Sequence, residues 1–386
     1  MSNISKEEFG SSEPNIIDKA KNFFKNRTKL WKILMIASVA LFLFCSIILA
    51  KVSISYFKTG KITTPELLLN DEQKKDDKQE AVICNECARR KIDGVYVHDD
   101  MVDPPLAAAM IDNHFNARPP IGLDKASLVI EAEVEGRFTR YLAVFDTSQD
   151  IDKIGPIRSA RPYFVDWAQG LNALYCHCGG SPQALAEIIQ KDINDLNEFY
   201  NAPYYWRDKS QSAPHNIYTS TEKLRILLEK QEINNSDLDA WSFKDDQALS
   251  EPQDTVIMID FPPNDFKVRW EYKKENNAYL RYLGGEKHLT ADDQEIISKN
   301  IIIQRLPAQV IDDKLRLEME TLGQGQAMIC LDGQCLDGYW DKPSLEERTK
   351  FYYEDESEVS FNAGTTWIEV VRPDVEIRLN DDKEEL

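Results

Sequence analysis

An uncharged apolar run near the start of the chain most constrains what it can fold into. Residues 33–50, ILMIASVALFLFCSIILA, contain no charged side chain, and such a run is long enough for a helix that crosses a membrane. Six basic residues precede it: Lys19, Lys21, Lys25, Arg27, Lys29 and Lys32. Because basic flanks remain in the cytoplasm, we expect a single-pass anchor over residues 33–57, with the rest of the chain on the extracytoplasmic side.

Two other uses of this run are weaker. A cleaved signal peptide normally has a shorter basic flank than residues 1–32, and ILAKVS is a marginal cleavage site. A lipid-modified cysteine follows a small residue, whereas Phe44 precedes Cys45 and apolar residues continue beyond it. We therefore predict residues 1–32 as a cytoplasmic tail and residues 58–92 as a charged stalk and linker.

The composition allows a sizeable core and limits the partners. The chain has 386 residues, 42% hydrophobic and 10% aromatic, which is enough for two ordinary domains. Its formal net charge of −20 argues against a nucleic-acid partner, because binding phosphates requires a basic surface. The sequence has no phosphate-loop or dinucleotide-binding motif and no carboxylate–histidine cluster with metal-ligand spacing, so we expect no cofactor and no metal.

The pattern of apolar residues changes near residue 249. Residues 93–248 alternate strand-like runs such as RYLAVF with helix-like runs such as TEKLRILLEK, which predicts a layered α/β domain. Residues 249–375 contain short alternating runs such as FKVRWEY, which predict a mostly antiparallel β domain. Residues 376–386 read as an acidic tail. The expected class is therefore α+β, with the membrane helix in front.

Six cysteines follow the apolar run, an even number that suits an oxidising compartment. In AMICLDGQCLDG, the Asp332-Gly333 pair predicts a two-residue hairpin turn that brings Cys330 opposite Cys335. Cα atoms of such a pair approach to roughly 4.5–5.5 Å, so we predict a disulfide. For the other four, structural disulfides and a less favoured zinc site both remain open: Cys84, Cys87, Cys176 and Cys178.

Two arginines stand out in this acidic chain. In KIGPIRSARPYF, Arg158 and Arg161 follow a turn and enter a helix predicted over residues 162–170. Guanidinium groups and the free N–H groups of a helix start favour an anion. In the alternative, both arginines pair with nearby acids: Glu131, Glu133 or Glu135. The spacing supports both interpretations equally.

A second helix start follows a predicted strand in NALYCHCGGSPQALAEI. The glycines allow a ligand to approach the backbone, and Ser181 is a good N-cap for a helix that begins at Pro182. Ser181 is a poor nucleophile candidate, because Pro182 has no N–H to donate to an oxyanion. His177 ends the strand, and SAPHNIYTS places His215 and Asn216 in a loop. We expect a small polar pocket at the carboxyl edge of a sheet.

Seven segments together resemble the YerB-like family of bacterial envelope proteins, a lipoprotein group whose domain has no assigned function. They are MIDNHFNARPPIGLDKASLVIEAEVEG, TRYLAVF, IGPIRSARPYFVDWA, HCGGSPQAL, APHNIYTS, GQAMICLDGQCLDGYW and AGTTWIEV, and the resemblance spans about residues 93–375. The chain departs from the family in its full apolar run around Cys45, in Arg137 and in the cysteines beside His177. The positions that match family motifs are Asn113, Arg118, Glu131, Glu135, Arg140, Arg158, Ser159, Arg161, His177, Gly180, Ser181, His215 and Asn216.

The resemblance favours a ligand site, since recurrent polar residues at loops and helix starts suit binding better than packing. We expect a membrane-anchored envelope protein that binds an anionic glycan, lipid headgroup or peptide. The alternative is a glycan or phosphate-ester enzyme with Glu135 or His177 as general base. A third possibility is a scaffold that binds another membrane protein through the β domain, at Trp270 or Trp340.

Overall fold

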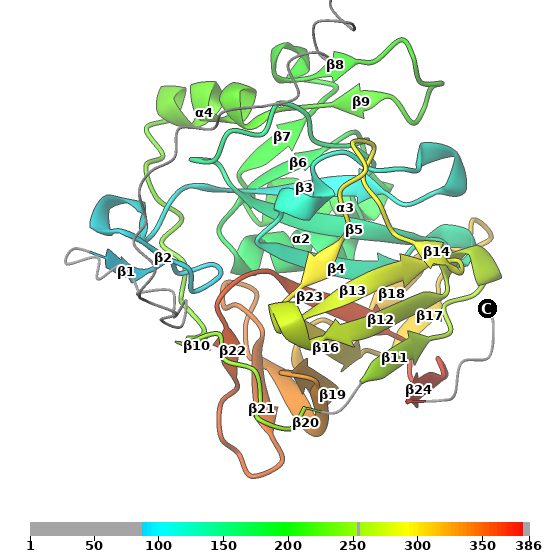
Figure 1. Ribbon diagram of the computed structural model, residues 1–386. Coiled ribbons are helices and arrows are strands. Elements are labelled where there is room, and N and C mark those ends of the chain that lie inside the picture. Colours follow the sequence, from blue (N-terminus) through cyan, green and yellow to red (C-terminus); the bar gives the residue numbers. More distant parts are fainter. Residues whose placement is uncertain (1–86, 253–254, 381–386) are drawn as a thin grey trace, which may run out of the picture. The chain divides into compact units, whose positions relative to one another are not determined.

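The computed structural model in Figure 1 describes residues 87–252 and 255–380. Contacts divide the chain into two units, Met1–Ala81 and Val82–Leu386, and the described residues all belong to the second. The predicted tail, anchor, most of the stalk and Cys84 lie outside the described residues, as does most of the acidic tail. Among the described residues, no helix has the length and apolar character needed to cross a membrane.

The strand-like and helix-like runs of residues 93–248 form the elements expected of them. Helix α2 begins at Pro162 and helix α3 at Pro182, both in the first-turn position that tolerates proline. The elements of this segment are β1 (Cys87–Arg89), β2 (Tyr96–His98), β3 (Leu106–Asp112), β4 (Leu128–Glu133), β5 (Thr139–Asp146), α2 (Pro162–Gly170), β6 (Leu174–His177), α3 (Pro182–Gln190), β7 (Asp195–Asn197), β8 (Trp206–Arg207), β9 (Ile217–Tyr218), α4 (Thr221–Lys230) and β10 (Ser242–Lys244).

The later segment contains no α-helix among its described residues, only strands and short 3-10 turns. Its strands are β11 (Val256–Ile259), β12 (Val268–Lys273), β13 (Ala278–Leu283), β14 (Glu286–Lys287), β15 (Ile297–Ser298), β16 (Asn300–Arg305), β17 (Ala308–Val310), β18 (Leu317–Met319), β19 (Gly323–Leu331), β20 (Gln334–Lys342), β21 (Lys350–Tyr353), β22 (Ser360–Asn362), β23 (Thr366–Val371) and β24 (Ile377–Leu379).

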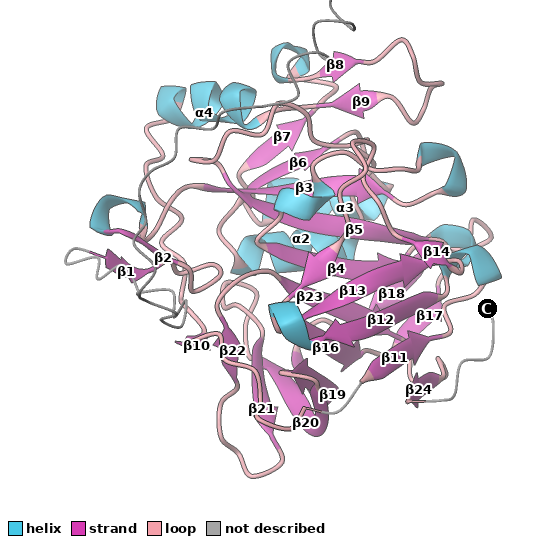
Figure 2. Ribbon diagram, in the orientation of Figure 1, coloured by secondary structure: helices cyan, strands magenta, loops and turns pink. Residues whose placement is uncertain are grey.

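Strands from both segments join in one large sheet. The ten strands lie in the order β21-β20-β19-β16-β23-β4-β5-β3-β6-β7, so β23 of the later segment pairs in parallel with β4 of the earlier one. The sequence predicted a layered α/β segment followed by a mostly antiparallel β segment, and it did not predict that the two would share one sheet. The described part of the chain is mostly β with few helices (Figure 2), so the expected α+β class is confirmed only in part. The limits given for the two segments remain predictions from the sequence.

The large sheet is the middle of a layered arrangement (Figure 1). One face packs against α2 and α3, in a core that contains Met110, Leu142 and Phe164. The other face packs against a six-stranded sheet of β14, β13, β12, β11 and β24 with β15, in a core that contains Tyr141 and Trp270. Because side chains alternate along a strand, consecutive residues of β3, β4 and β5 enter different cores.

The predicted hairpin disulfide is confirmed. Cys330 and Cys335 are paired across β19 and β20 with Cα atoms 4.0 Å apart, and Asp332 and Gly333 form the turn with left-handed backbone angles. Cys87 is also disulfide-bonded, which removes it from the zinc site considered above. Cys176 and Cys178 are free thiols, so neither forms the structural disulfide considered above.

Candidate functional site

Strand alternation divides the polar motif between the two faces of the large sheet. Asp112 and Arg140 are cross-strand neighbours on β3 and β5, in phase with the residues that face the helices. The adjacent residues Asn113 and Thr139 point the other way, and Asn113 Nδ2 donates to Thr139 Oγ1 at 2.7 Å. The motif therefore forms two clusters rather than one site.

We define the rim cluster as the polar group on the helix side of the sheet edge and the inter-sheet cluster as the group between the two sheets. The rim cluster consists of Asp112, His114, Glu135, Arg140, Arg158, Arg161 and His215. The inter-sheet cluster consists of Asn113, Arg118, Glu131, Thr139, Tyr141, Trp270, Arg281, His288, Trp367 and Glu369.

The backbone of residues 155–160 builds the rim. It runs across the carboxyl ends of β3 and β6, which are parallel neighbours. The Arg158 N–H donates to Met110 O at 2.8 Å, and the Cys178 N–H donates to Arg158 O at 3.0 Å. Arg158 is thereby fixed between two strand ends, at the kind of edge where layered folds bind ligands.

Asp112 organises one side of the rim. Its Oδ2 accepts from Nδ1 of His215 at 2.6 Å and lies 2.9 Å from Nε of Arg158. His114 stacks on His215, with ring centroids 5.0 Å apart and an interplanar angle of 16°. Burial lowers the pKa of His114, and the charges of His215, Arg158 and Arg118 lower it further against the opposing effect of Asp112.

Arg161 forms the ion pair that the alternative interpretation expected. Its Nε and Nη2 donate to the two carboxylate oxygens of Glu135, both at 2.6 Å, and its Nη1 donates to Ala160 O at 2.6 Å. Burial tends to raise the pKa of Glu135, but the hydrogen bonds and charge of Arg161 outweigh burial and lower it. All three guanidinium nitrogens of Arg161 are therefore occupied, and Glu135 is a weak candidate for a general base.

Arg140 is the rim arginine without a carboxylate. It is only 8% exposed, and its one hydrogen bond to a described residue runs from Nη1 to Ser159 O at 2.8 Å. Burial, together with the charges of Arg161 and Arg158, lowers its pKa to about 10. A buried cation normally has an anionic partner, so Arg140 is an unbalanced charge.

The rim thus carries a local excess of positive charge in an acidic protein. Its guanidinium groups are those of Arg140, Arg158 and Arg161, and its carboxylates are only those of Asp112 and Glu135. One elementary positive charge remains even with both histidines neutral. An incoming anion would find donors on Arg140 and Arg158 that no described carboxylate engages.

The second helix start has the predicted cap beside an open pocket. Ser181 Oγ accepts from the Ala184 N–H at 3.2 Å, which confirms it as the N-cap of α3. A pocket of about 210 Å³ lies between this helix start and the β17–β18 hairpin, lined by Arg161, Pro162, Ser181, Pro182, Gln183, Ile311, Arg316 and Leu317. Gly180 lies too close to Ala160 and Leu185 for a larger side chain, so it serves packing at this point.

His177 and Asn216 do not reach the rim. His177 is fully buried, with Nδ1 facing Gly179 O at 2.7 Å and Nε2 facing Asp195 Oδ1 at 2.5 Å, so neither nitrogen is free to act as a base. Asn216 instead accepts from Nη1 of Arg207 at 3.2 Å and donates to backbone carbonyls of its own loop.

The inter-sheet cluster is a buried ionic network centred on Arg281, in which Nε of Arg281, Nε2 of His288 and Oε2 of Glu369 have no hydrogen-bond partner among the described residues. Nη2 of Arg281 donates to Glu131 at 2.5 Å, and its Nη1 donates to Nδ1 of His288 at 2.8 Å. Although burial opposes it, the negative charge of Glu131 raises the pKa of Arg281. Burial and the charge of Arg281 lower the pKa of His288 well below its usual value, so the ring is neutral and accepts. These side chains fasten the six-stranded sheet to the large one.

Glu369 lies beside Glu131 on the neighbouring strand, and both side chains are inaccessible to solvent. Burial raises the pKa of Glu369 well above its usual value, and the charge of Glu131 raises it further. The raised pKa favours the protonated form of Glu369, whose Oε1 accepts from Trp270 Nε1 at 2.8 Å and lies 3.8 Å from Nε of Arg281. Arg118 and Asn113 belong to this network as well, since Arg118 Nε donates to Asn113 Oδ1 at 3.0 Å.

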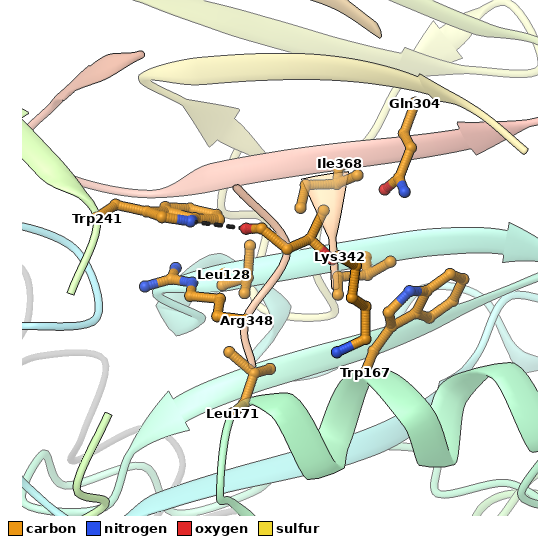
Figure 3. A pocket seen from close by; sticks show the side chains of 10 residues that line it. Leu128, Trp167, Leu171, Trp241, Gln304, Lys342, Arg348 and Ile368 are labelled. Atoms are coloured by element: carbon orange, nitrogen blue, oxygen red, sulfur yellow. Dashed lines mark hydrogen bonds between the residues drawn. The ribbon is translucent and has the colours of Figure 1, made fainter. Parts of the chain in front are cut away.

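A cavity on the helix side holds two further buried cations (Figure 3). Lys342 extends toward Trp167 and donates to Glu347 O at 2.5 Å, while the Arg348 guanidinium lies 3.2 Å from the Trp241 ring centroid. Burial lowers the pKa of Lys342 to about 8 and that of Arg348 to about 9. The cavity walls are mostly apolar, and the two cations occupy different ends, so we assign them to packing.

Three further findings bear on the alternatives. Trp270 and Trp340, named above as a partner surface, are both buried. No group of histidine, cysteine or carboxylate side chains in residues 87–252 and 255–380 could hold a metal ion. Asp112 and His114 were not among the predicted site residues, although both lie in the MIDNHF run beside Asn113. Strand alternation would have placed them on the face opposite to that of Asn113.

Comparison with known proteins gives a consistent family. Residues 94–234 match the model "Protein of unknown function (DUF3048) N-terminal domain", and residues 257–368 match the corresponding C-terminal domain. The chain is 28% identical over 295 residues to "Putative lipoprotein YerB" of Bacillus subtilis (strain 168), which covers 73% of this chain and 86% of the relative. The crystal structure of YerB protein from Bacillus subtilis matches with a TM-score of 0.68 and 26% identity, over 75% of this chain and 99% of that one.

Proposed function

Because the chain belongs to the YerB-like DUF3048 family, whose function is unknown, we propose a function from the chemistry of its own rim cluster. The protein is an extracytoplasmic component of the cell envelope that binds an anionic group at the rim. The apolar run at residues 33–50 anchors it, and the name of its lipoprotein relative is consistent with a membrane-associated body.

The observation that carries the proposal is the unbalanced Arg140. A guanidinium that is 8% exposed and bonded only to Ser159 O leaves donors that an anion can satisfy. Arg158 supplies a second set of donors, because its Nη1 makes only one hydrogen bond to a described residue, a long one of 3.4 Å to Pro214 O. Charge-assisted hydrogen bonds from such groups are about twice as strong as neutral ones.

The bound group most compatible with these donors is a phosphate or a carboxylate. Arg140 and Arg158 come from different elements, so their guanidinium planes can approach one oxyanion from two directions. His114 adds a dependence on pH: burial and the charges of its neighbours lower its pKa in the free protein, and a bound anion would raise that pKa again by offsetting those positive charges. Binding should therefore strengthen as the pH falls from 7.5 to 6.

The test measures binding of inorganic phosphate to the full-length protein in detergent by titration calorimetry. Arg140→Gln and Arg158→Gln should each weaken binding at least tenfold. Arg225→Gln is the matched control, since Arg225 pairs with Asp150 on the exposed side of α4 and should bind as the wild type does. Equal affinity in all four proteins, or no binding to the wild type, would contradict the proposal.

A further inference from the structure

Two exposed aromatic rings lie next to the rim cluster, one beside His114 and one beside Gly179. The side chain of Phe115 is 50% exposed, and its ring lies 4.0 Å from that of His114, which in turn stacks on His215. On the other side, Phe199 is 65% exposed and lies against Gly179, next to the segment that carries Arg158. Large apolar rings at the surface mark contact sites when they adjoin convergent polar groups.

The position of Phe199 is fixed by the backbone beneath it. Gly179 has a φ of +62°, and a Cβ there would lie 2.9 Å from Phe199 Cε2, so only glycine lets the ring rest on the chain. The Phe199 N–H donates to Asn197 Oδ1 at 3.2 Å, which also accepts from the Gly179 N–H at 3.0 Å. These bonds fix the backbone of Phe199 beside Gly179, which places its ring at the edge of the rim.

Gly179 connects this ring to the arginines. Its carbonyl accepts from the Ala160 N–H at 3.0 Å, and the neighbouring Cys178 N–H donates to Arg158 O at 3.0 Å. The ring of Phe199 therefore rests on a residue, Gly179, whose backbone is hydrogen-bonded to the segment between Arg158 and Arg161. Phe115 follows β3 and Phe199 follows β7, and β6 lies between these two strands in the sheet, so both rings lie at the edge that the segment of Arg158 crosses.

Phe115 completes a chain of rings on the opposite side. Its ring is 6.4 Å from that of Phe138 at 79°, and His114 is 5.0 Å from Phe138 at 82°. Edge-to-face contacts of this kind hold a ring at a defined angle. The exposed face of Phe115 is thus oriented by its neighbours rather than free to turn.

We infer that the rim takes an anionic sugar, a pyranose ring that carries a phosphate or carboxylate. This rests on the anion binding proposed above and adds the substrate class. The C–H face of a sugar packs on an aromatic ring, and its acidic group reaches Arg140 and Arg158. A bare anion uses only the arginines, and an acyclic lipid headgroup offers no ring face to Phe115 or Phe199.

The experiment compares three probes on the full-length protein in detergent by titration calorimetry: inorganic phosphate, glycerol 3-phosphate and glucose 6-phosphate. Glucose 6-phosphate should bind at least tenfold more tightly than the other two, which should resemble each other. Phe199→Ala and Phe115→Ala should each reduce the affinity for glucose 6-phosphate toward that for phosphate and leave phosphate binding unchanged. Ile226→Ala, at a position 55% exposed on α4, is the matched control and should alter neither.

The outcomes separate the two proposals. Phosphate binding without a gain from the sugar would overturn the sugar inference and leave the anion site standing. Glycerol 3-phosphate bound as tightly as glucose 6-phosphate would indicate a lipid headgroup and would overturn the inference. Loss of all binding would remove both proposals.

Discussion

The rim cluster and the inter-sheet cluster are built from adjacent residues and differ in whether their central arginine has a carboxylate partner: Arg281 has one between the sheets, and Arg140 has none among the described residues at the rim. Asp112 and Arg140 lie at the rim, whereas their chain neighbours Asn113 and Thr139 lie between the sheets. Between the sheets, the charged Arg281 and Glu131 are matched and sealed from solvent. At the rim, a buried cation has no carboxylate partner.

The difference shows how one polar motif can serve two purposes. Burying a matched ion pair costs desolvation energy during folding. Removing either partner then destabilises the fold, because it leaves a buried charge alone. A cluster with an unpaired cation adds little to the stability of the fold and can bind an anion. We therefore expect substitutions between the sheets to affect folding and substitutions at the rim to affect binding.

The largest effect should come from Arg281→Met. The variant leaves Glu131 buried without its cation and His288 without its donor, so the free energy of unfolding should fall by about 3–5 kcal/mol. Urea unfolding of the full-length protein measures it. Arg269→Met is the control, because Arg269 pairs with Glu271 on the more exposed face of β12 and should cost less than about 1 kcal/mol. Equal losses would mean that the inter-sheet pair is not the stronger clamp.

The two buried carboxyl groups should respond differently to amidation. Glu131→Gln removes the charge that Arg281 needs and should cost about 1.5–3 kcal/mol. Glu369→Gln replaces a protonated acid with a neutral group of similar shape, so it should change stability by less than about 1 kcal/mol. Unfolding midpoints of both variants decide the assignment. A larger loss for Glu369→Gln would place the charge on Glu369 instead.

Acid should weaken the inter-sheet cluster through His288. Its pKa is lowered in the folded protein, so below an unfolded value of about 6.5 the unfolded chain takes up a proton that the folded chain does not. Stability is thus retained above pH 6.5 and lost as the pH falls, at up to about 1.4 kcal/mol per pH unit for this histidine. His288→Gln should flatten the part of the profile between pH 6.5 and 5, whereas His98→Gln, at a residue with a side chain 59% exposed, should leave it as steep.

Ser181→Ala sharpens the comparison within the rim. The cap bond to the Ala184 N–H is lost, so α3 should be destabilised by about 1 kcal/mol. The hydroxyl is not part of the rim cluster, and phosphate affinity should therefore change less than threefold. Thermal unfolding and calorimetry on the same sample test both statements. A large loss of affinity with unchanged stability would make Ser181 a ligand rather than a cap.

Local features of this fold could be predicted from the sequence. The Asp332-Gly333 turn placed Cys330 opposite Cys335, and the Gly-Gly-Ser-Pro run placed the cap of α3, because both depend on a few neighbouring residues. The strands of the later segment were also identifiable from their alternation. The anchor and the ligand remain predictions.

The pairing of β23 with β4 could not be predicted in this way. The two strands are separated by more than 200 residues, and an apolar run such as TWIEVV does not specify its neighbour. The choice between an anion site and ion pairs was also undecided by spacing. Arg161 pairs with Glu135 and Arg140 stays without a carboxylate because the β4–β5 turn brings one acid to the rim, a matter of tertiary geometry.

The most direct test of the account is the stability of wild-type protein and Arg140→Gln, each measured in urea with and without inorganic phosphate. Without phosphate, the two should agree within about 1 kcal/mol, since Arg140 has no carboxylate to lose. At a hundred times the wild-type dissociation constant, phosphate should stabilise the wild type by about 2.7 kcal/mol and the variant, which binds at least tenfold more weakly, by no more than about 1.4 kcal/mol. A variant that is several kcal/mol less stable without phosphate, or that phosphate stabilises as much as the wild type, would contradict the division between a folding cluster and a binding rim.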